Sequence, residues 1–128
     1  MPVEDEMQDE GFSAFWEQEE EAAVLRIRGE LDLSASAALR ACLLDEVGLE
    51  GPPIVIDLSD VPFVDSTCLG ALISVMRQAR LTRGGLRLAA VQPRVRRALE
   101  IAALDDVFPI FSSVHEAVAA GGEPTPGL

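Results

Sequence analysis

The segment from Asp57 to Gly70, DLSDVPFVDSTCLG, holds the polar side chains that are best placed for chemistry. It connects a predicted buried strand to a predicted helix, and α/β proteins place their sites where strands end and helices begin. Ser66 lies at the expected helix start, where its hydroxyl is near solvent among exposed backbone N–H groups that favour anions. The residues Asp65 to Thr67 could instead serve only as a helix cap, which is a common use of these residue types.

The hydrophobic pattern predicts two strands, a helix and a third strand before this segment. Phe12 to Glu17 is a short strand candidate, and apolar and polar residues alternate over Ala22 to Gly29, so an antiparallel hairpin is expected. Apolar residues then recur at helical spacing from about Ala35 to Val47. Ile54 to Leu58 is a β-branched run of the kind that is buried on both faces of a sheet, which predicts a central strand.

Helices and strands continue to alternate after the segment. The pattern predicts a helix from Asp65–Thr67 to Gly84–Gly85, a strand over Leu86 to Val91, a helix from Pro93, a strand near Val107 to Phe111, and a helix capped by Ser113. Pro109 places the last of these strands at a sheet edge. The sum is an α/β fold with a mixed β-sheet of four to five strands and about four helices in a single domain, residues 12–120.

Length and charge limit the classes of function. The 128 residues suffice for one domain, with an acidic disordered tail expected at 1–11 and a second disordered tail at 121–128. The net charge is -12, so a nucleic-acid backbone or an anionic membrane would be repelled and neither is expected as a partner. Because the chain shows neither a secretory signal nor a long apolar span, we expect a cytoplasmic protein. A mostly polar exterior makes a monomer the default.

Several enzymatic chemistries lack their essential residues. All ten basic residues are Arg, so the chain has no lysine. A receiver-type phosphoacceptor, for which Asp57 could be the aspartate, would resemble its family only with a lysine. A GxxxxGK phosphate loop also needs its lysine to reach the phosphates. His115 is the one histidine, and Ser66 has no hydrolase motif around it. Cys42 and Cys68 lack metal-ligand spacing and are interpreted as reduced core residues. We therefore expect no enzymatic activity, no cofactor and no metal.

Three segments together resemble the STAS family, which joins sulphate transporters with anti-sigma factor antagonists. They are Gly29-Glu30-Leu31-Asp32-Leu33, Ile54 to Ser59, and Val61 to Gly70. The likeness covers about residues 12 to 120, and its most specific part is the Asp-Ser-Thr-x-Leu-Gly stretch that contains Ser66. One departure is Cys68, where the family often has glycine.

The resemblance implies a function and a site. In stand-alone antagonists of this family, the serine that matches Ser66 is phosphorylated by a partner anti-sigma factor that is also a kinase. The expected function is therefore that of an anti-sigma factor antagonist, a partner-switching regulator of transcription that sequesters an anti-sigma serine kinase and so releases a sigma factor. A serine phosphatase would reverse the modification. The resemblance places further residues at the partner surface, namely Asp32, Leu33, Ser59, Asp60, Asp65, Thr67 and Leu69.

Three alternatives stay open from the sequence. STAS domains also serve as soluble subunits of lipid (ABC-type) transporters, which is the competing function. Asp32 could be a plain cap of the first helix. Thiols at helix starts can have a lowered pKa, so Cys68 has a conceivable redox role beside the simpler one of a small packed residue.

Overall fold

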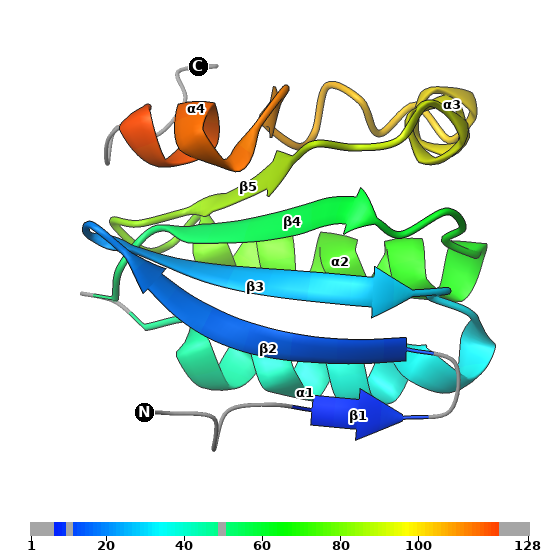
Figure 1. Ribbon diagram of the computed structural model, residues 1–128, viewed down its shortest axis with the longest axis horizontal. Helices are drawn as coiled ribbons and strands as arrows, with labels where there is room; N and C mark the ends of the chain where they lie inside the picture. Colours follow the sequence, from blue (N-terminus) through cyan, green and yellow to red (C-terminus); the bar gives the residue numbers. More distant parts are fainter. Residues whose placement is uncertain (1–6, 10–11, 49–50, 121–128) are drawn as a thin grey trace.

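A mixed six-stranded sheet forms the centre of the structure, a computed structural model that describes residues 7–9, 12–48 and 51–120 (Figure 1). The strands lie side by side in chain order: β1 Met7–Asp9, β2 Phe12–Glu19, β3 Ala22–Gly29, β4 Ile54–Asp60, β5 Leu86–Ala89 and β6 Ile110–Phe111. The β1–β2 and β2–β3 pairs are antiparallel, whereas β3 to β6 run parallel. The predicted hairpin and the mixed α/β sheet are confirmed.

The two edge strands differ from the expectations. Residues 7–9, assigned to an acidic tail, pair with Phe12–Ala14 of β2 as strand β1, because backbone pairing to an open strand edge needs no apolar pattern. The remainder of the expected tails lies outside the described residues. β6 is also shorter than predicted, because Phe108 enters the core from the turn before it and is only 2% exposed. β6 is the outermost strand on its side of the sheet, as predicted from Pro109, although Pro109 precedes the strand and does not lie within it.

The four predicted helices are present. They are α1 Ser36–Glu46, α2 Ser66–Ala79, α3 Pro93–Ile101 and α4 Val114–Ala119, with a 3₁₀ helix, η2 Leu33–Ala35, before α1. Pro93 occupies the first turn of α3, where its missing N–H costs nothing. The Ser113 hydroxyl accepts the Glu116 amide at 3.0 Å, which confirms the predicted N-terminal cap of α4. The second helix ends at Ala79, five residues earlier than Gly84.

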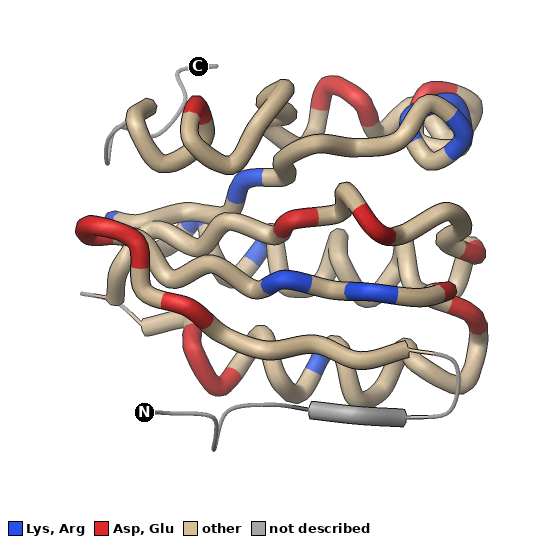
Figure 2. The backbone as a smooth tube through the Cα atoms, in the orientation of Figure 1, with Lys and Arg blue, Asp and Glu red and all other residues tan. Residues whose placement is uncertain are grey.

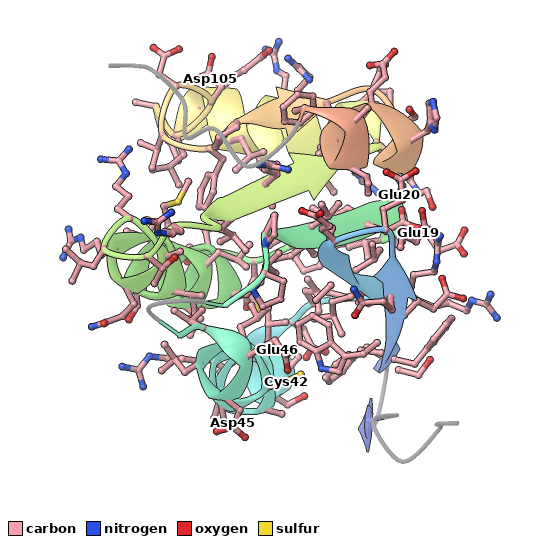
Figure 3. All side chains as sticks on the ribbon, turned by 90° about the vertical axis from the view of Figure 1, so that its left-hand side faces the viewer. Glu19, Glu20, Cys42, Asp45, Glu46 and Asp105 are labelled. Carbon is pink, nitrogen blue, oxygen red and sulfur yellow. The ribbon has the colours of Figure 1, made fainter. Side chains whose placement is uncertain are left out.

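Strand β4 is buried on both faces, as its β-branched sequence predicts. Ile54, Ile56 and Leu58 join the large core cluster together with side chains of α1, α2 and α3, whereas Val55 faces the opposite way into a smaller cluster with α4. The view along the sheet in Figure 3 shows α1 and α2 on one side of the strands, with Glu19 and Glu20 at the β2–β3 turn. This packing fixes the carboxyl end of β4, and with it the loop that leads to Ser66.

Candidate functional site

Ser66 is the first residue of α2, and it is exposed to solvent. The helix cap is supplied by its neighbour: the Asp65 carboxylate accepts the backbone amides of Thr67 at 2.9 Å and Cys68 at 3.1 Å. Asp65 has the extended backbone typical of an N-cap, with φ -89° and ψ 173°. Of the three residues Asp65 to Thr67, Asp65 therefore caps the helix with its side chain. The Ser66 hydroxyl is not used for this cap and is accessible to solvent.

A non-local backbone pairing brings the segment that follows β3 against this helix start. The Leu31 amide donates to the Phe63 carbonyl at 2.9 Å, and the Asp65 amide donates to the Leu31 carbonyl at 2.9 Å. Leu31 and Val64 thus form an isolated parallel bridge. The bridge joins residues more than thirty positions apart in the sequence and sets the 31–33 segment beside α2.

Asp32 is placed beside the first turn of α2 by this bridge, and it is also a cap. Its carboxylate accepts the amide of Ser34 at 3.1 Å and the Ser34 hydroxyl at 2.9 Å, and it begins the 3₁₀ helix η2. Asp32 therefore caps the 3₁₀ helix η2 and not α1, whose N-cap residue is Ala35. Its role at a partner surface remains a prediction.

Two large apolar side chains are exposed at the same junction. Leu33 follows Asp32 and is 66% exposed, and Phe63, which accepts the bridging hydrogen bond, is 40% exposed. Exposed apolar residues beside an accessible hydroxyl are typical of a protein-docking surface. Phe63 was not among the residues predicted from the sequence. The feature that could have identified it is an aromatic side chain within a loop that is otherwise rich in polar residues. We call Leu33, Phe63, Ser66 and Thr67 the docking surface, on the hypothesis that a partner binds here.

Leu69, which was expected at the partner surface, is buried in this structure. Leu69 is only 7% exposed and packs in the large core cluster, because it faces the sheet on α2. Ser59 and Asp60 are exposed at the end of β4, but their contacts are with other elements. The Ser59 carbonyl accepts the Gln92 side-chain amide at 2.7 Å, and the Asp60 carboxylate lies 3.5 Å from Nε of Arg28.

Cys68 is completely buried, and its thiol donates to the Asp32 carbonyl oxygen with an Sγ–O distance of 3.1 Å. Burial is the main cause that raises the pKa of Cys68 to about 11, and the negative charges of Asp65 and Asp32 raise it further. Such a thiol stays protonated near neutral pH, which argues against the redox role and supports a packed residue.

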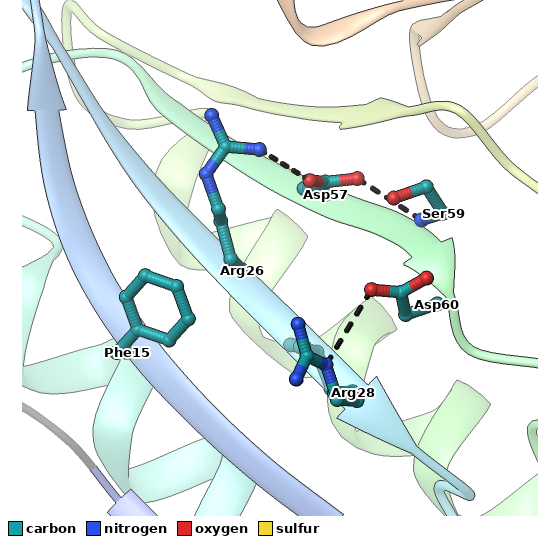
Figure 4. Close-up of a pocket in the computed structure, with 7 residues that line it drawn as sticks. Phe15, Arg26, Arg28, Asp57, Ser59 and Asp60 are labelled. Carbon is teal, nitrogen blue, oxygen red and sulfur yellow. Dashed lines mark hydrogen bonds and ion pairs between the residues drawn. The ribbon is translucent and has the colours of Figure 1, made fainter.

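A second polar region lies on the open face of the sheet, where β2, β3 and β4 form a hollow of about 220 Å³ (Figure 4). Arg26 donates to Asp57 at 2.6 Å and to two glutamates of β2, and hydrogen bonding to Glu17 is the largest cause that raises the pKa of Arg26. Asp57 also accepts the Ser59 amide at 3.0 Å. Asp57 is therefore a paired structural carboxylate. Figure 2 shows the arginines of β3 beside the acidic residues of β4, with further acidic residues toward the β2–β3 turn.

Neither a metal centre nor a membrane span is found in the described part of the chain. No group of three or more His, Cys, Asp or Glu residues is arranged to hold a metal ion there. None of the helices described combines the length and apolarity needed to cross a membrane.

Comparison with known proteins identifies the fold family. The family model of the STAS domain matches residues 16–117. The chain belongs to the STAS domain family. The resemblance drawn from the three sequence segments is thereby confirmed over almost the same range, and the accessible serine at the start of α2 lies within the matched part of this STAS domain.

Similar proteins carry a consistent description. The anti-sigma-F factor antagonist RsfB of Mycobacterium tuberculosis is 34% identical over 97 residues, which cover 75% of this chain and 78% of that protein. The anti-sigma-B factor antagonist of Bacillus subtilis is 30% identical over 93 residues, which cover 73% of this chain and 84% of the relative. The crystal structure of an anti-sigma factor antagonist from Mycobacterium paratuberculosis matches with a TM-score of 0.77 and 27% identity, covering 89% of this chain and 97% of that one.

Proposed function

We propose that this STAS domain is an anti-sigma factor antagonist whose binding is switched off by phosphorylation of Ser66. In its unmodified form it sequesters an anti-sigma factor with serine kinase activity and so releases a sigma factor for transcription. The observation that carries the proposal is the accessible Ser66 hydroxyl at the first residue of α2, beside exposed Leu33 and Phe63. The similar proteins described as anti-sigma factor antagonists support the same function.

The docking surface suits contact with a protein. Leu33 and Phe63 supply apolar area, and the exposed Thr67 supplies a hydroxyl next to Ser66. Asp32 and Asp65 border it with negative charge. An unmodified serine at its centre is neutral, so a partner can cover it without burying an unpaired charge.

Phosphorylation changes this surface strongly. A phosphate adds about -1.5 to -2 charges, and a partner carboxylate about 4 Å away would be repelled by on the order of 4 kcal/mol per unit charge pair at an intermediate dielectric. Since about 1.4 kcal/mol corresponds to tenfold in affinity, the repulsion suffices for roughly a thousandfold loss. The positive end of α2 favours the phosphate by only about 0.3–1 kcal/mol. The switch therefore acts on the interface and leaves the fold largely intact.

The decisive experiment combines a kinase assay with binding measurements. Candidate anti-sigma kinases are incubated with the protein and ATP, and tandem mass spectrometry locates the phosphate, which we expect on Ser66. In calorimetry, Ser66→Ala should bind the kinase permanently and Ser66→Asp poorly. In the kinase assay, Thr67→Ala removes the neighbouring hydroxyl and should still be phosphorylated at Ser66, which shows that position 67 is not the modified residue. Equal affinity of the Ala and Asp variants at position 66 would refute the switch.

The partners and setting follow from the same proposal. A serine phosphatase restores the unmodified form, and the protein acts in the cytoplasm as a monomer. The competing function, a subunit of a lipid transporter, predicts constant association with transporter subunits. A pull-down with mass spectrometry separates the two: an ATP-binding anti-sigma kinase supports the switch, and transporter ATPase subunits contradict it.

A further inference from the structure

Cys68 connects the two segments that form the docking surface. The backbone bridge between them ends at the hydrogen bond from the Asp65 amide to the Leu31 carbonyl. Beyond this bond, the segment after Leu31 continues into η2 and the segment after Asp65 continues into α2. The Cys68 thiol joins them again, because its Sγ lies 3.1 Å from the carbonyl oxygen of Asp32. That oxygen also accepts the Ala35 amide at 3.0 Å, so both of its lone pairs have a donor.

The bonded carbonyl belongs to the peptide unit that precedes Leu33. Rotation of this peptide would move the Leu33 side chain, which is 66% exposed, relative to Ser66 on the neighbouring helix. Two kinds of hydrogen bond fix Asp32: its carboxylate accepts the Ser34 amide, and its backbone carbonyl accepts the Cys68 thiol. The thiol is therefore placed to fix the position of an exposed apolar anchor without contacting the partner itself.

The donor is chemically stable in this setting. Cys68 is buried completely, and its thiol lies between two acidic residues, Asp65 and Asp32, so that the neutral S–H form is favoured. A glycine at this position would offer no side chain and no donor. This chain thus has a contact within its docking surface that a glycine would remove.

We propose that Cys68 is a positioning residue of the docking surface: its hydrogen bond to the Asp32 carbonyl holds Leu33 in place beside Ser66 and narrows the range of anti-sigma factors that the surface accepts. The selectivity part of this inference rests on the proposed function, whereas the positioning part concerns the isolated protein. A surface that is held in its binding conformation loses less entropy on binding. Partners that fit this conformation therefore bind more tightly, whereas partners that need a different conformation do not gain affinity.

The positioning part is tested by amide hydrogen exchange of the free protein. Cys68→Ala removes the donor, and the Ser34 and Ala35 amides should exchange about two- to fivefold faster, as expected for loss of one weak S–H···O bond. Cys68→Ser, which keeps a donor, should restore most of the protection, and Cys42→Ala on α1 (Figure 3) is the control for loss of a thiol elsewhere. Unchanged exchange in Cys68→Ala, or an equal increase at Val55 of the central strand, would overturn the proposal.

The selectivity part is tested against a panel of purified anti-sigma kinases encoded by the same genome. We expect the ratio of affinities between the strongest and the next binder to fall about two- to fivefold in Cys68→Ala and to recover in Cys68→Ser, because serine keeps a hydrogen-bond donor at position 68 and alanine does not. The same ratio in all three proteins would refute selectivity through Cys68. If the unmodified wild-type protein binds no kinase of the panel, the proposed function fails, while the exchange result still decides the positioning role.

Discussion

Asp65 and Ser66 have different tasks at the start of α2, although they are neighbours in the chain. The Asp65 carboxylate accepts two amides of the first turn, and the Ser66 hydroxyl is exposed. The residue that stabilises the helix is therefore not the residue proposed to be modified. A phosphate can be added or removed at this helix start without removing the side chain that caps it.

The first prediction separates these two tasks. Asp65→Ala should lower the free energy of unfolding by about 1 kcal/mol, the usual cost of a lost N-cap. Ser66→Ala should change it by less than about 0.5 kcal/mol, as for exposed positions in general. Urea denaturation followed by circular dichroism measures both values. Equal destabilisation by the two substitutions would show that the Ser66 hydroxyl contributes to the cap.

The second prediction concerns the ion pairs of the open sheet face. Arg26 pairs with Asp57, which is only 6% exposed, so Arg26→Met leaves a buried carboxylate with the Ser59 amide as its remaining partner. We expect a loss of about 1–3 kcal/mol in the free energy of unfolding.

Arg28→Met is the matched control for this substitution. Arg28 lies two positions further along β3, and its pair with Asp60 is exposed, with side-chain accessibilities of 74% and 58%. Its removal should cost no more than about 0.5–1 kcal/mol. Urea titrations of the two variants give the comparison. A cost for Arg28→Met as large as that for Arg26→Met would contradict the assignment of the stabilisation to the buried Asp57.

The local elements were predictable because each carries its own signal. Ile54 to Leu58 identified the central strand by composition, and Pro93 and Ser113 marked helix starts by their chemistry. Strand β1 has polar residues and gains its structure from the edge of β2, which no local pattern reveals. The position of Asp32 beside the start of α2 depends on the Leu31–Val64 bridge, a contact between distant segments, and was therefore expected only from family resemblance. The burial of Leu69 was not predictable, because a sequence motif does not distinguish its buried members from its exposed ones.

The third prediction uses the unusual composition of the chain at alkaline pH. The sequence has no lysine and no tyrosine, so thiols are the side chains that titrate between pH 9 and 11. Folding raises the pKa of Cys68 from 9.0 to about 11, which means that the folded state holds this proton more tightly than the unfolded chain. The free energy of unfolding should therefore fall as the pH rises from about 9 and level off above about 11.

Variants at the two cysteines assign this alkaline effect. In urea titrations at a series of pH values, Cys68→Ser should abolish most of the decline between pH 9 and 11. Cys42→Ser should retain it, because its substitution leaves the buried Cys68 thiol unchanged. A decline of the same size in the Cys68→Ser protein would mean that another group causes the loss of stability.

The fourth prediction tests whether an exposed leucine near Ser66 acts in binding. Leu33 is 66% exposed and Leu81 is 72% exposed, but Leu81 follows the far end of α2, roughly 20 Å from Ser66 along a fourteen-residue helix. Leu33→Ala should weaken binding of the anti-sigma kinase by about 1–2 kcal/mol, or roughly five- to thirtyfold, because apolar contact area is lost. Leu81→Ala should leave the affinity unchanged, and both variants should keep their unfolding free energies within about 0.5 kcal/mol. Calorimetry with the unmodified proteins gives the affinities, and an equal effect of the two substitutions would place the interface away from the start of α2.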